Sequence, residues 1–255
     1  MARELLVIMP VHNEEDCLDA VLREWMASLE LTGIDFEILL LDDGSTDGTA
    51  AVIAQCVQAE NGGRIRSKRH DNMGHGQTCL QGYREACWSG APWVFQIDSD
   101  GQCDPAYFPA VWAARHDHEV VYGRRTVRRD GWTRVLASVL VRGLVRIAAG
   151  VSCPDANVPY RLMSTARLLP LVDTVPSGFD LANIALAVQI KRAAWREGTV
   201  PIVFRPRAGG EPSVPLIRFA GKALELFGQL LLLPRPLRRA IGAEPRIRQT
   251  GHRGD

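Results

Sequence analysis

The chain has 255 residues, of which 46% are hydrophobic and 23% are charged, proportions that are ordinary for a soluble globular protein with one or two domains. A net charge of +1 gives no electrostatic argument for a nucleic-acid partner, and none is expected. The six cysteines are scattered and form no C-x-x-C pair, so they favour neither a zinc or redox motif nor a disulfide framework.

Short apolar runs alternate with helical periodicity along the first hundred residues. Buried strands are predicted at residues 5–9, 36–41 and 93–97, with a basic strand at 64–68. Helices are predicted over residues 14–30, 49–59 and 77–89. The alternation predicts an α/β fold with a mostly parallel sheet.

Three of the apolar strands end in polar loops, at residues 10–15, 42–47 and 98–104. Ligands of open α/β sheets bind beyond the carboxyl ends of the strands, so these loops are predicted to converge on one pocket. Asp98 and Asp100 leave their strand on the same side, where two carboxylates suit Mg²⁺ or Mn²⁺, and Gln102 is a further oxygen donor. An ordinary acidic turn is the alternative.

Two further segments carry polar groups at the same edge. Asp42 and Asp43 are positioned to accept hydrogen bonds from a base or a ribose, while the residues after them, 44–46, also suit a tight turn and a helix cap. In residues 70–78, Gly74 and Gly76 permit close backbone approach at a helix N-terminus, which favours an anion.

Taken in order, four segments resemble glycosyltransferase family 2, which has the GT-A fold, a Rossmann-like sheet flanked by helices. These segments are residues 7–15, 40–49, 72–76 and 95–102, and the resemblance covers about residues 4–215. It implies a nucleotide-sugar site lined by Pro10, His12, Glu14, Asp42, Asp43, Asp98 and Ser99. It also implies that Asp98, Asp100 and Gln102 hold the metal ion.

Later segments resemble the polyprenyl-phosphate branch of that family, typified by dolichol-phosphate mannose synthase. They are residues 122–129, 155–163 and 207–213, although Val214 replaces the lysine of those synthases and Pro212 shifts the serine by one position. The resemblance implies an acceptor-phosphate site formed by Arg125, Arg128, Arg161, Arg207 and Ser213. Asp98, Asp100 and Arg125 are the predicted catalytic residues.

The chemistry of the acceptor supports the same branch. A hydroxyl acceptor needs a carboxylate base, whereas a lipid phosphate is already an anion and needs cations such as arginine. Between Phe179 and Trp195 the only acid is Asp180, and arginines are plentiful. A carbohydrate or natural-product hydroxyl stays the alternative acceptor. A binding protein that has lost catalysis and a nucleotidyltransferase are more distant alternatives.

Two amphipathic segments, residues 132–150 and 216–239, suit either the protein core or a membrane surface. The predicted organisation is therefore a GT-A domain over residues 1–215, a helix over 216–239 and a disordered tail over 240–255. The N-terminus has no secretory signal, and the longest charge-free apolar run near the C-terminus, 226–234, is too short to cross a bilayer. A cytoplasmic location, with peripheral contact to the inner face of the cell membrane, is predicted.

The sequence thus predicts inverting transfer of a hexose from a UDP- or GDP-linked sugar to a polyprenyl phosphate. The identity of the sugar and of the base stays open.

Overall fold

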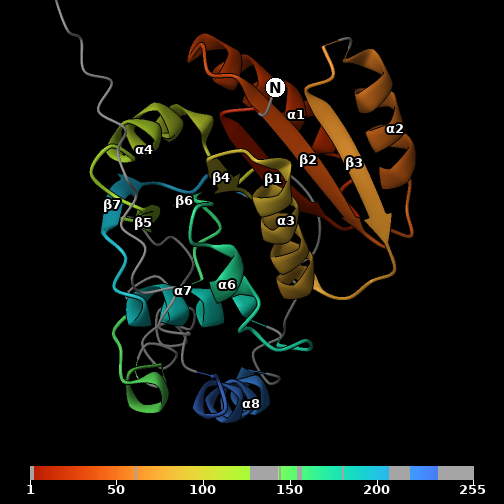
Figure 1. The fold of residues 1–255 in the computed structure, drawn as a ribbon. Coiled ribbons are helices and arrows are strands. Elements are labelled where there is room, and N and C mark those ends of the chain that lie inside the picture. The colour runs from red at the N-terminus through yellow and green to blue at the C-terminus, as the bar shows by residue number, and fades with distance from the viewer. Residues whose placement is uncertain are drawn as a thin grey trace, which may run out of the picture.

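The computed structural model describes residues 3–60, 62–126, 143, 145–153, 157–179, 181–206 and 219–234. Within these residues seven strands form one sheet, in the order β3-β2-β1-β4-β6-β5-β7. The strands are β1 (Leu5–Val11), β2 (Phe36–Asp43), β3 (Ile65–His70), β4 (Trp93–Gln96), β5 (Val120–Arg125), β6 (Arg161–Ser164) and β7 (Glu197–Ile202). The predicted α/β fold is confirmed (Figure 1).

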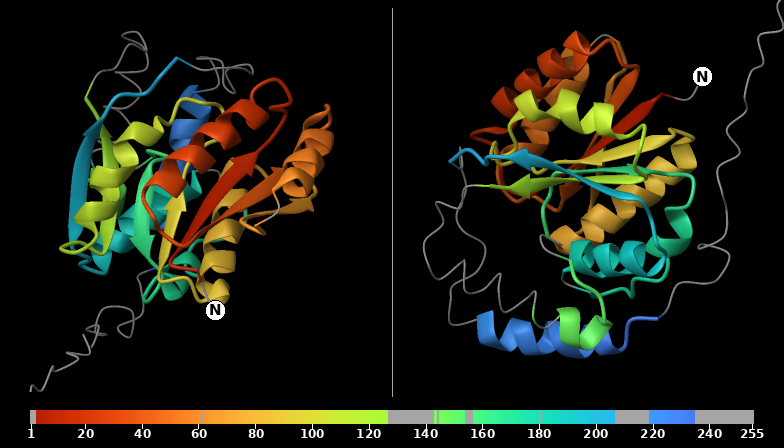
Figure 2. Two further views of the ribbon diagram at one scale, coloured as in Figure 1. Left: turned by 90° about the horizontal axis from the view of Figure 1, so that it is seen from above. Right: turned by 90° about the vertical axis from the view of Figure 1, so that its left-hand side faces the viewer.

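Helices cover both faces of the sheet (Figures 1 and 2). One face carries α1 (Leu18–Leu31), α2 (Thr49–Ala59), the 3-10 turn η1 (Pro105–Tyr107) and α4 (Phe108–Ala114). The other carries α3 (His75–Ser89), α6 (Leu169–Val172) and α7 (Ala182–Arg192). The final described helix, α8 (Phe219–Leu231), lies beyond α7 on the side away from the sheet.

The direction of β6 decides which loops meet at the functional edge. β1 runs parallel to β2 and β4, and β5 runs parallel to β7. β6 lies between β4 and β5 and is antiparallel to both. The carboxyl ends of β1, β2, β4 and β5 therefore share one edge with the beginning of β6, so the chain that leads into β6 reaches the same place as the loops that leave its neighbours.

The central strands are buried on both faces, as their continuous apolar runs predict. The sequence prediction ended the first strand before Pro10, yet β1 continues to Val11. Pro10 is tolerated because β4 pairs with β1 only as far as Ile8, so the missing N–H faces a side without a paired strand. The strand therefore delivers residues 10–14 directly to the edge.

Two helix starts differ from the prediction. The first helix begins at Leu18 rather than at residue 14, because residues 14–17 form a turn in which the Glu14 N–H donates to Thr49 Oγ1 at 2.8 Å. The third begins at His75 rather than at residue 77. The later start of α1 leaves residues 14–17 in the loop at the edge, whereas the earlier start of α3 places His75 and Gly76 in the first turn of that helix.

The C-terminal helix packs on the protein by one side. Leu226 and Leu230 of α8 are buried. Gln189 Nε2 of α7 donates to the carbonyl of Pro234, which follows the end of α8, at 2.7 Å. Leu231 and Leu232 stay 58% and 83% exposed. Among the described residues no helix is long and apolar enough to cross a membrane. The membrane-surface role of residues 216–239 stays a prediction, and the predicted tail, 240–255, lies outside the described residues.

Candidate active site

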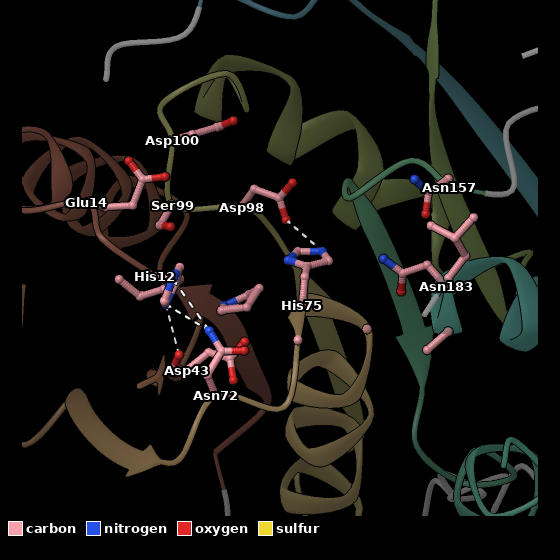
Figure 3. A pocket seen from close by; sticks show the side chains of 16 residues that line it. His12, Glu14, Asp43, Asn72, His75, Asp98, Ser99, Asp100, Asn157 and Asn183 are labelled. Atoms are coloured by element: carbon pink, nitrogen blue, oxygen red, sulfur yellow. Dashed lines mark hydrogen bonds and ion pairs between the residues drawn. The ribbon is translucent and has the colours of Figure 1, made fainter. Parts of the chain in front are cut away.

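A cavity with a volume of about 510 Å³ opens at the carboxyl ends of β1, β2 and β4 (Figure 3). It is lined by Pro10, Val11, His12, Glu14, Asp43, Asn72, Gly74, His75, Gly76, Asp98, Ser99, Asp100, Asn157, Leu181, Ala182 and Asn183. The three polar loops that follow the apolar strands thus converge, as predicted. The segment that leads into α3 joins them.

One side of this cavity carries the carboxylates of Glu14, Asp43, Asp98 and Asp100, here called the acidic wall. The opposite side is formed by Asn157, Leu181, Ala182 and Asn183, here called the amide wall. Figure 3 shows His75 beside Asp98 of the acidic wall, with Asn157 and Asn183 of the amide wall across the cavity.

The loop after β4 presents Asp98 and Asp100 to the cavity. Asp100 is 8% exposed, and its Oδ1 accepts a hydrogen bond from the Gln102 N–H at 3.1 Å, which fixes the turn. The side chain of Asp98 is 28% exposed and its Oδ1 lies 3.7 Å from His75 Nε2. Two adjacent carboxylates in a partly enclosed loop are the hard oxygen ligands that Mg²⁺ and Mn²⁺ prefer.

The same donor set limits how an ion is held. Within the described part of the chain, no group of three or more His, Cys, Asp or Glu side chains is arranged to bind a metal by itself. Gln102, a predicted ligand, does not line the cavity, and its Nε2 donates instead to the Arg205 carbonyl at 3.4 Å. The residues present fit an ion that shares its coordination sphere between Asp98, Asp100 and oxygens of a substrate.

The end of the cavity near β2 offers polar groups for a nucleoside. Asp43 Oδ1 accepts a hydrogen bond from the Met73 N–H at 2.7 Å, which ties the β2 loop to the segment before α3. His12 Nδ1 lies 2.9 Å from the Asp43 carbonyl, and Asn72 Nδ2 lies 3.5 Å from the same ring. Gly44 has a φ of +65°, and a Cβ there would stand 2.7 Å from the Asn72 nitrogen, so only glycine permits this approach.

Asp42 and Asp43 are adjacent in sequence but differ in their surroundings. The carboxylate of Asp42 accepts a hydrogen bond from the Ser45 N–H at 2.9 Å and lies 3.5 Å from Arg69 Nε. Asp42 does not line the cavity, whereas Asp43 does. In this structure Asp42 stabilises the turn, the local role that the sequence also allowed, and its place in the nucleotide-sugar site stays a prediction.

His75 places a cation at the beginning of α3. Its ring is 52% exposed, with Nε2 3.5 Å from Cys79 Sγ. Cys79, followed by the carboxylates of Asp98 and Asp43, raises the pKa of His75 to about 10 against the opposing effect of burial, which favours the protonated ring while Asp98 holds no cation. The helix N-terminus adds positive potential at the same point. A divalent ion on Asp98 would lower this pKa again.

The predicted acceptor-phosphate residues do not form one cluster among the described residues. Arg125 ends β5 at the same edge as Asp98, with its guanidinium 5.4 Å from the centre of the Phe204 ring, but it does not line the cavity. Arg128, Arg207 and Ser213 lie outside the described residues.

Arg161 is a correction to the sequence prediction. Its side chain is fully buried at the start of β6, with Nη2 donating to the Val158 carbonyl at 2.8 Å and Nη1 to the Asn183 carbonyl at 3.2 Å. A guanidinium in this position has no surface for an acceptor phosphate. Arg161 instead holds together the two segments that form the amide wall.

Several lining residues were not singled out from the sequence. Asn157 lies in the segment 155–163 but was not chosen within it, and Asn183 belongs to no short motif; both line the cavity where α7 packs near the chain before β6. Asn72 and His75 lie in the segment that the sequence marked for its glycines, but those glycines gave no reason to choose either side chain.

Comparison with solved structures shows the same fold in a group of mycobacterial proteins. Glucosyl-3-phosphoglycerate synthase from Mycobacterium tuberculosis, in complex with Mn²⁺, UDP and phosphoglyceric acid, matches with a TM-score of 0.65 at 18% identity, over 96% of this chain and 80% of that chain. Its complex with Mn²⁺, UDP-glucose and phosphoglyceric acid matches with a TM-score of 0.62 at 21% identity, over 90% and 79%. At these identities the similarity establishes a shared GT-A fold.

The family follows from the sequence itself. The model of glycosyl transferase family 2 matches residues 6–146, which is more than half of the chain. The protein belongs to this family.

Proposed function

We propose that the protein transfers a hexosyl group from a nucleoside-diphosphate sugar to a polyprenyl phosphate, with Mg²⁺ or Mn²⁺ held by Asp98 and Asp100. The observation that carries the donor part is the shared cavity, in which the Asp98–Asp100 loop stands beside the nucleoside-binding groups of β1 and β2. A diphosphate next to Asp43, Asp98 and Asp100 would be repelled without a cation. The Mn²⁺ and UDP-glucose bound by the structurally similar synthase support the same donor class.

The acidic wall, together with His12 and His75, binds the donor in this proposal. Asp43 and His12 bind the nucleoside, Asp98 and Asp100 would hold the ion, and the side chain of His75 faces the diphosphate. Asp98 and Asp100 would hold this ion where, when bound, it would stabilise the negative charge of the departing diphosphate. The acceptor oxygen attacks the anomeric carbon in line as the bond from that carbon to the diphosphate breaks, so the configuration at this carbon is inverted.

The composition of the amide wall supports an acceptor that is already an anion. Among its described residues no side chain is a carboxylate that would deprotonate a hydroxyl. Arg125 supplies a cation at the same edge of the sheet, at the end of β5. A phosphate oxygen needs no base and is attracted by such a cation.

Exposed apolar side chains support a lipid acceptor. Ile147 is 75% exposed in the helical segment 145–149, and Leu231 and Leu232 are exposed at the end of α8. The guanidinium of Arg192 joins the two regions, because it donates to the Ala149 carbonyl at 3.3 Å and to the Leu233 carbonyl at 3.2 Å. An apolar surface of this kind suits contact with a membrane interface, where a polyprenyl phosphate resides.

A hydroxyl acceptor is the second candidate. The structurally similar synthase binds phosphoglyceric acid together with UDP-glucose, which favours a small hydroxyl-bearing acid as the alternative. Such an acceptor needs a base, and Asp180, next to the lining residue Leu181, is the acid that the sequence supplies there.

The test is a transfer assay with Mn²⁺, in which UDP-glucose and GDP-mannose are each incubated with undecaprenyl phosphate, 3-phosphoglycerate or a panel of soluble sugars. The proposal expects a glycolipid product, and it expects Asp180→Asn to keep activity within a few-fold. Transfer to a soluble hydroxyl, with activity lost in Asp180→Asn, would replace the lipid acceptor by the second candidate. Absence of transfer and of Mn²⁺-dependent nucleotide binding would refute both.

A further inference from the structure

The amide wall is supported from behind by a chain of buried hydrogen bonds that the proposed function does not use. Asn183 is 2% exposed, and its Oδ1 accepts a hydrogen bond from the Tyr83 hydroxyl at 3.1 Å. The same hydroxyl also bonds to Gln96 Oε1, and Gln96 Nε2 donates to Cys79 Sγ at 3.3 Å. The chain thus runs from α7 through α3 to β4 beneath the cavity.

The Asn183 amide is fixed in place but keeps one end available. Within the described part of the chain, no group accepts a hydrogen bond from its Nδ2. Among the described residues, Asn183 Nδ2 is not one of the buried side-chain atoms that lack a partner, so this atom reaches the open space of the cavity. A polar group of a ligand in the cavity is therefore its natural partner, since Asn183 is one of the lining residues.

Tyr83 determines how that amide is held. Burial raises the pKa of Tyr83 well above its usual value, so the group stays a neutral hydroxyl. A hydroxyl has one hydrogen to donate, so one of its two amide neighbours, Gln96 or Asn183, presents its NH₂ to the Tyr83 oxygen. In either arrangement one end of the Asn183 amide is bound to Tyr83 and the other end faces the cavity.

Arg161 fixes the backbone of the same wall. Its guanidinium donates to the carbonyls of Val158 and Asn183, which lie in the two segments that supply Asn157 and Asn183. The guanidinium is fully buried and stands 5.5 Å from the centre of the Tyr122 ring. Tyr83 thus holds the side chain of Asn183. Arg161 holds the backbone of Asn183 and that of Val158, the residue after Asn157.

We propose that Asn157 and Asn183 bind the hydroxyl groups of the neutral hexose of the donor, and that Tyr83 and Arg161 are positioning residues for them. The inference rests on the proposed function and specifies its substrate class. Carboxamides both donate and accept hydrogen bonds, as sugar hydroxyls do. The described residues of the wall include no cation that would pair with the carboxylate of a uronic acid, and the nearby His75 is directed at Asp98, with Nε2 3.7 Å from Oδ1. The wall therefore selects an uncharged sugar and has no contact with the nucleotide.

The first experiment separates the sugar from the nucleotide. Isothermal titration with Mn²⁺ compares UDP with UDP-glucose, and GDP with GDP-mannose, and the pair that binds more tightly is used. Asn183→Ala and Asn157→Ala should each weaken binding of the nucleotide sugar about 3- to 10-fold, the loss of one or two hydrogen bonds, and leave the nucleotide within twofold. UDP-glucuronate should bind the unaltered protein at least tenfold more weakly than UDP-glucose.

The second experiment tests Tyr83 as a positioning residue. Tyr83→Phe removes only the hydroxyl, and it should raise KM for the nucleotide sugar while leaving the inhibition constant of the free nucleotide unchanged. Tyr160→Phe is the matched control, because it removes another buried hydroxyl, which donates to the Asp104 carbonyl at 3.1 Å and makes no hydrogen bond to Asn183. The control should lower stability to a similar extent and leave both constants unchanged.

The outcomes distinguish this inference from the proposed function. If both nucleotides fail to bind with Mn²⁺, the proposed function is wrong and the inference falls with it. If the nucleotide binds normally but the asparagine variants lose nothing, or lose nucleotide and nucleotide sugar equally, only the inference is overturned. Tighter binding of UDP-glucuronate than of UDP-glucose would also overturn it.

Discussion

The two walls of the cavity are built by different means. The acidic wall consists of loops that follow parallel strands, and its side chains carry negative charge that a bound cation would neutralise. The amide wall comes from the chain before an antiparallel strand and from the first turn of α7, and it is held by the buried side chains of Tyr83 and Arg161. Under the proposed function, the charged wall would serve the diphosphate and the fixed neutral groups would serve the sugar.

The largest effect is expected on the acidic wall. Asp100→Ala removes one of the two proposed metal ligands, so Mn²⁺-dependent transfer should fall about 1000-fold, the scale of several kcal/mol of transition-state stabilisation. The rate of nucleotide release from the donor measures this. The melting temperature should change little.

The control for this variant is Asp16→Ala, which removes an exposed carboxylate from the turn before α1. It should keep full activity. Equal activity in the Asp100 and Asp16 variants would show that Asp100 does not hold a catalytic metal ion.

The second effect is on stability and belongs to the amide wall. Arg161→Met leaves the buried carbonyls of Val158 and Asn183 without their donor, which should lower the free energy of unfolding by about 3 kcal/mol. Urea titration measures the change. Arg124→Met, at an exposed position of β5, should cost less than about 0.5 kcal/mol. An equally small loss for Arg161 would mean that the wall is held by something else.

A third prediction sharpens the description of the acidic wall. Asp43→Asn removes the charge beside the nucleoside pocket but keeps an acceptor for the Met73 N–H, so nucleotide affinity should fall about tenfold. Asp42→Asn keeps the bond to the Ser45 N–H and should leave affinity within twofold. Isothermal titration calorimetry measures the nucleotide affinity of both variants. A larger loss in Asp42→Asn than in Asp43→Asn would mean that Asp42, not Asp43, contacts the nucleoside.

The smallest effect concerns the surface beyond the amide wall. Replacing Leu231 and Leu232 together by serine should reduce co-sedimentation with vesicles of phosphatidylglycerol and phosphatidylethanolamine about fivefold, because less apolar area is buried in the interface. Leu31→Ser, at an equally exposed leucine at the end of α1, should have no effect. Equal vesicle binding by all variants would show that Leu231 and Leu232 do not contact the membrane.

The sequence predicted the acidic wall better than the amide wall for a physical reason. Asp43, Asp98 and Asp100 lie where parallel strands end, and such ends meet at one edge whatever the details of packing. Asn157 and Asn183 are 26 positions apart and meet only because Arg161 and Tyr83 bind their surroundings. No local pattern encodes a contact of that kind.

Arg161 shows the limit of motif reasoning most directly. Its place in a segment that resembles an acceptor-binding motif suggested a phosphate contact, but the same segment forms β6, and pairing with Gln96 and Tyr122 carries Arg161 into the interior. A motif identified the residue as important. Only the packing of β6 distinguished a ligand contact from a structural one.

The reversed course of β6 also has a consequence for how this enzyme tolerates added sequence. After β1, β2 or β4, extra length would project into the cavity, whereas for β6 it is length inserted ahead of the strand, near Asn157, that would do so. Residues that follow Ser164 sit at the opposite rim, beside the start of β4. Length added just before Asn157 would therefore change the lining of the cavity, whereas length added after residue 164 would lie at the rim away from it.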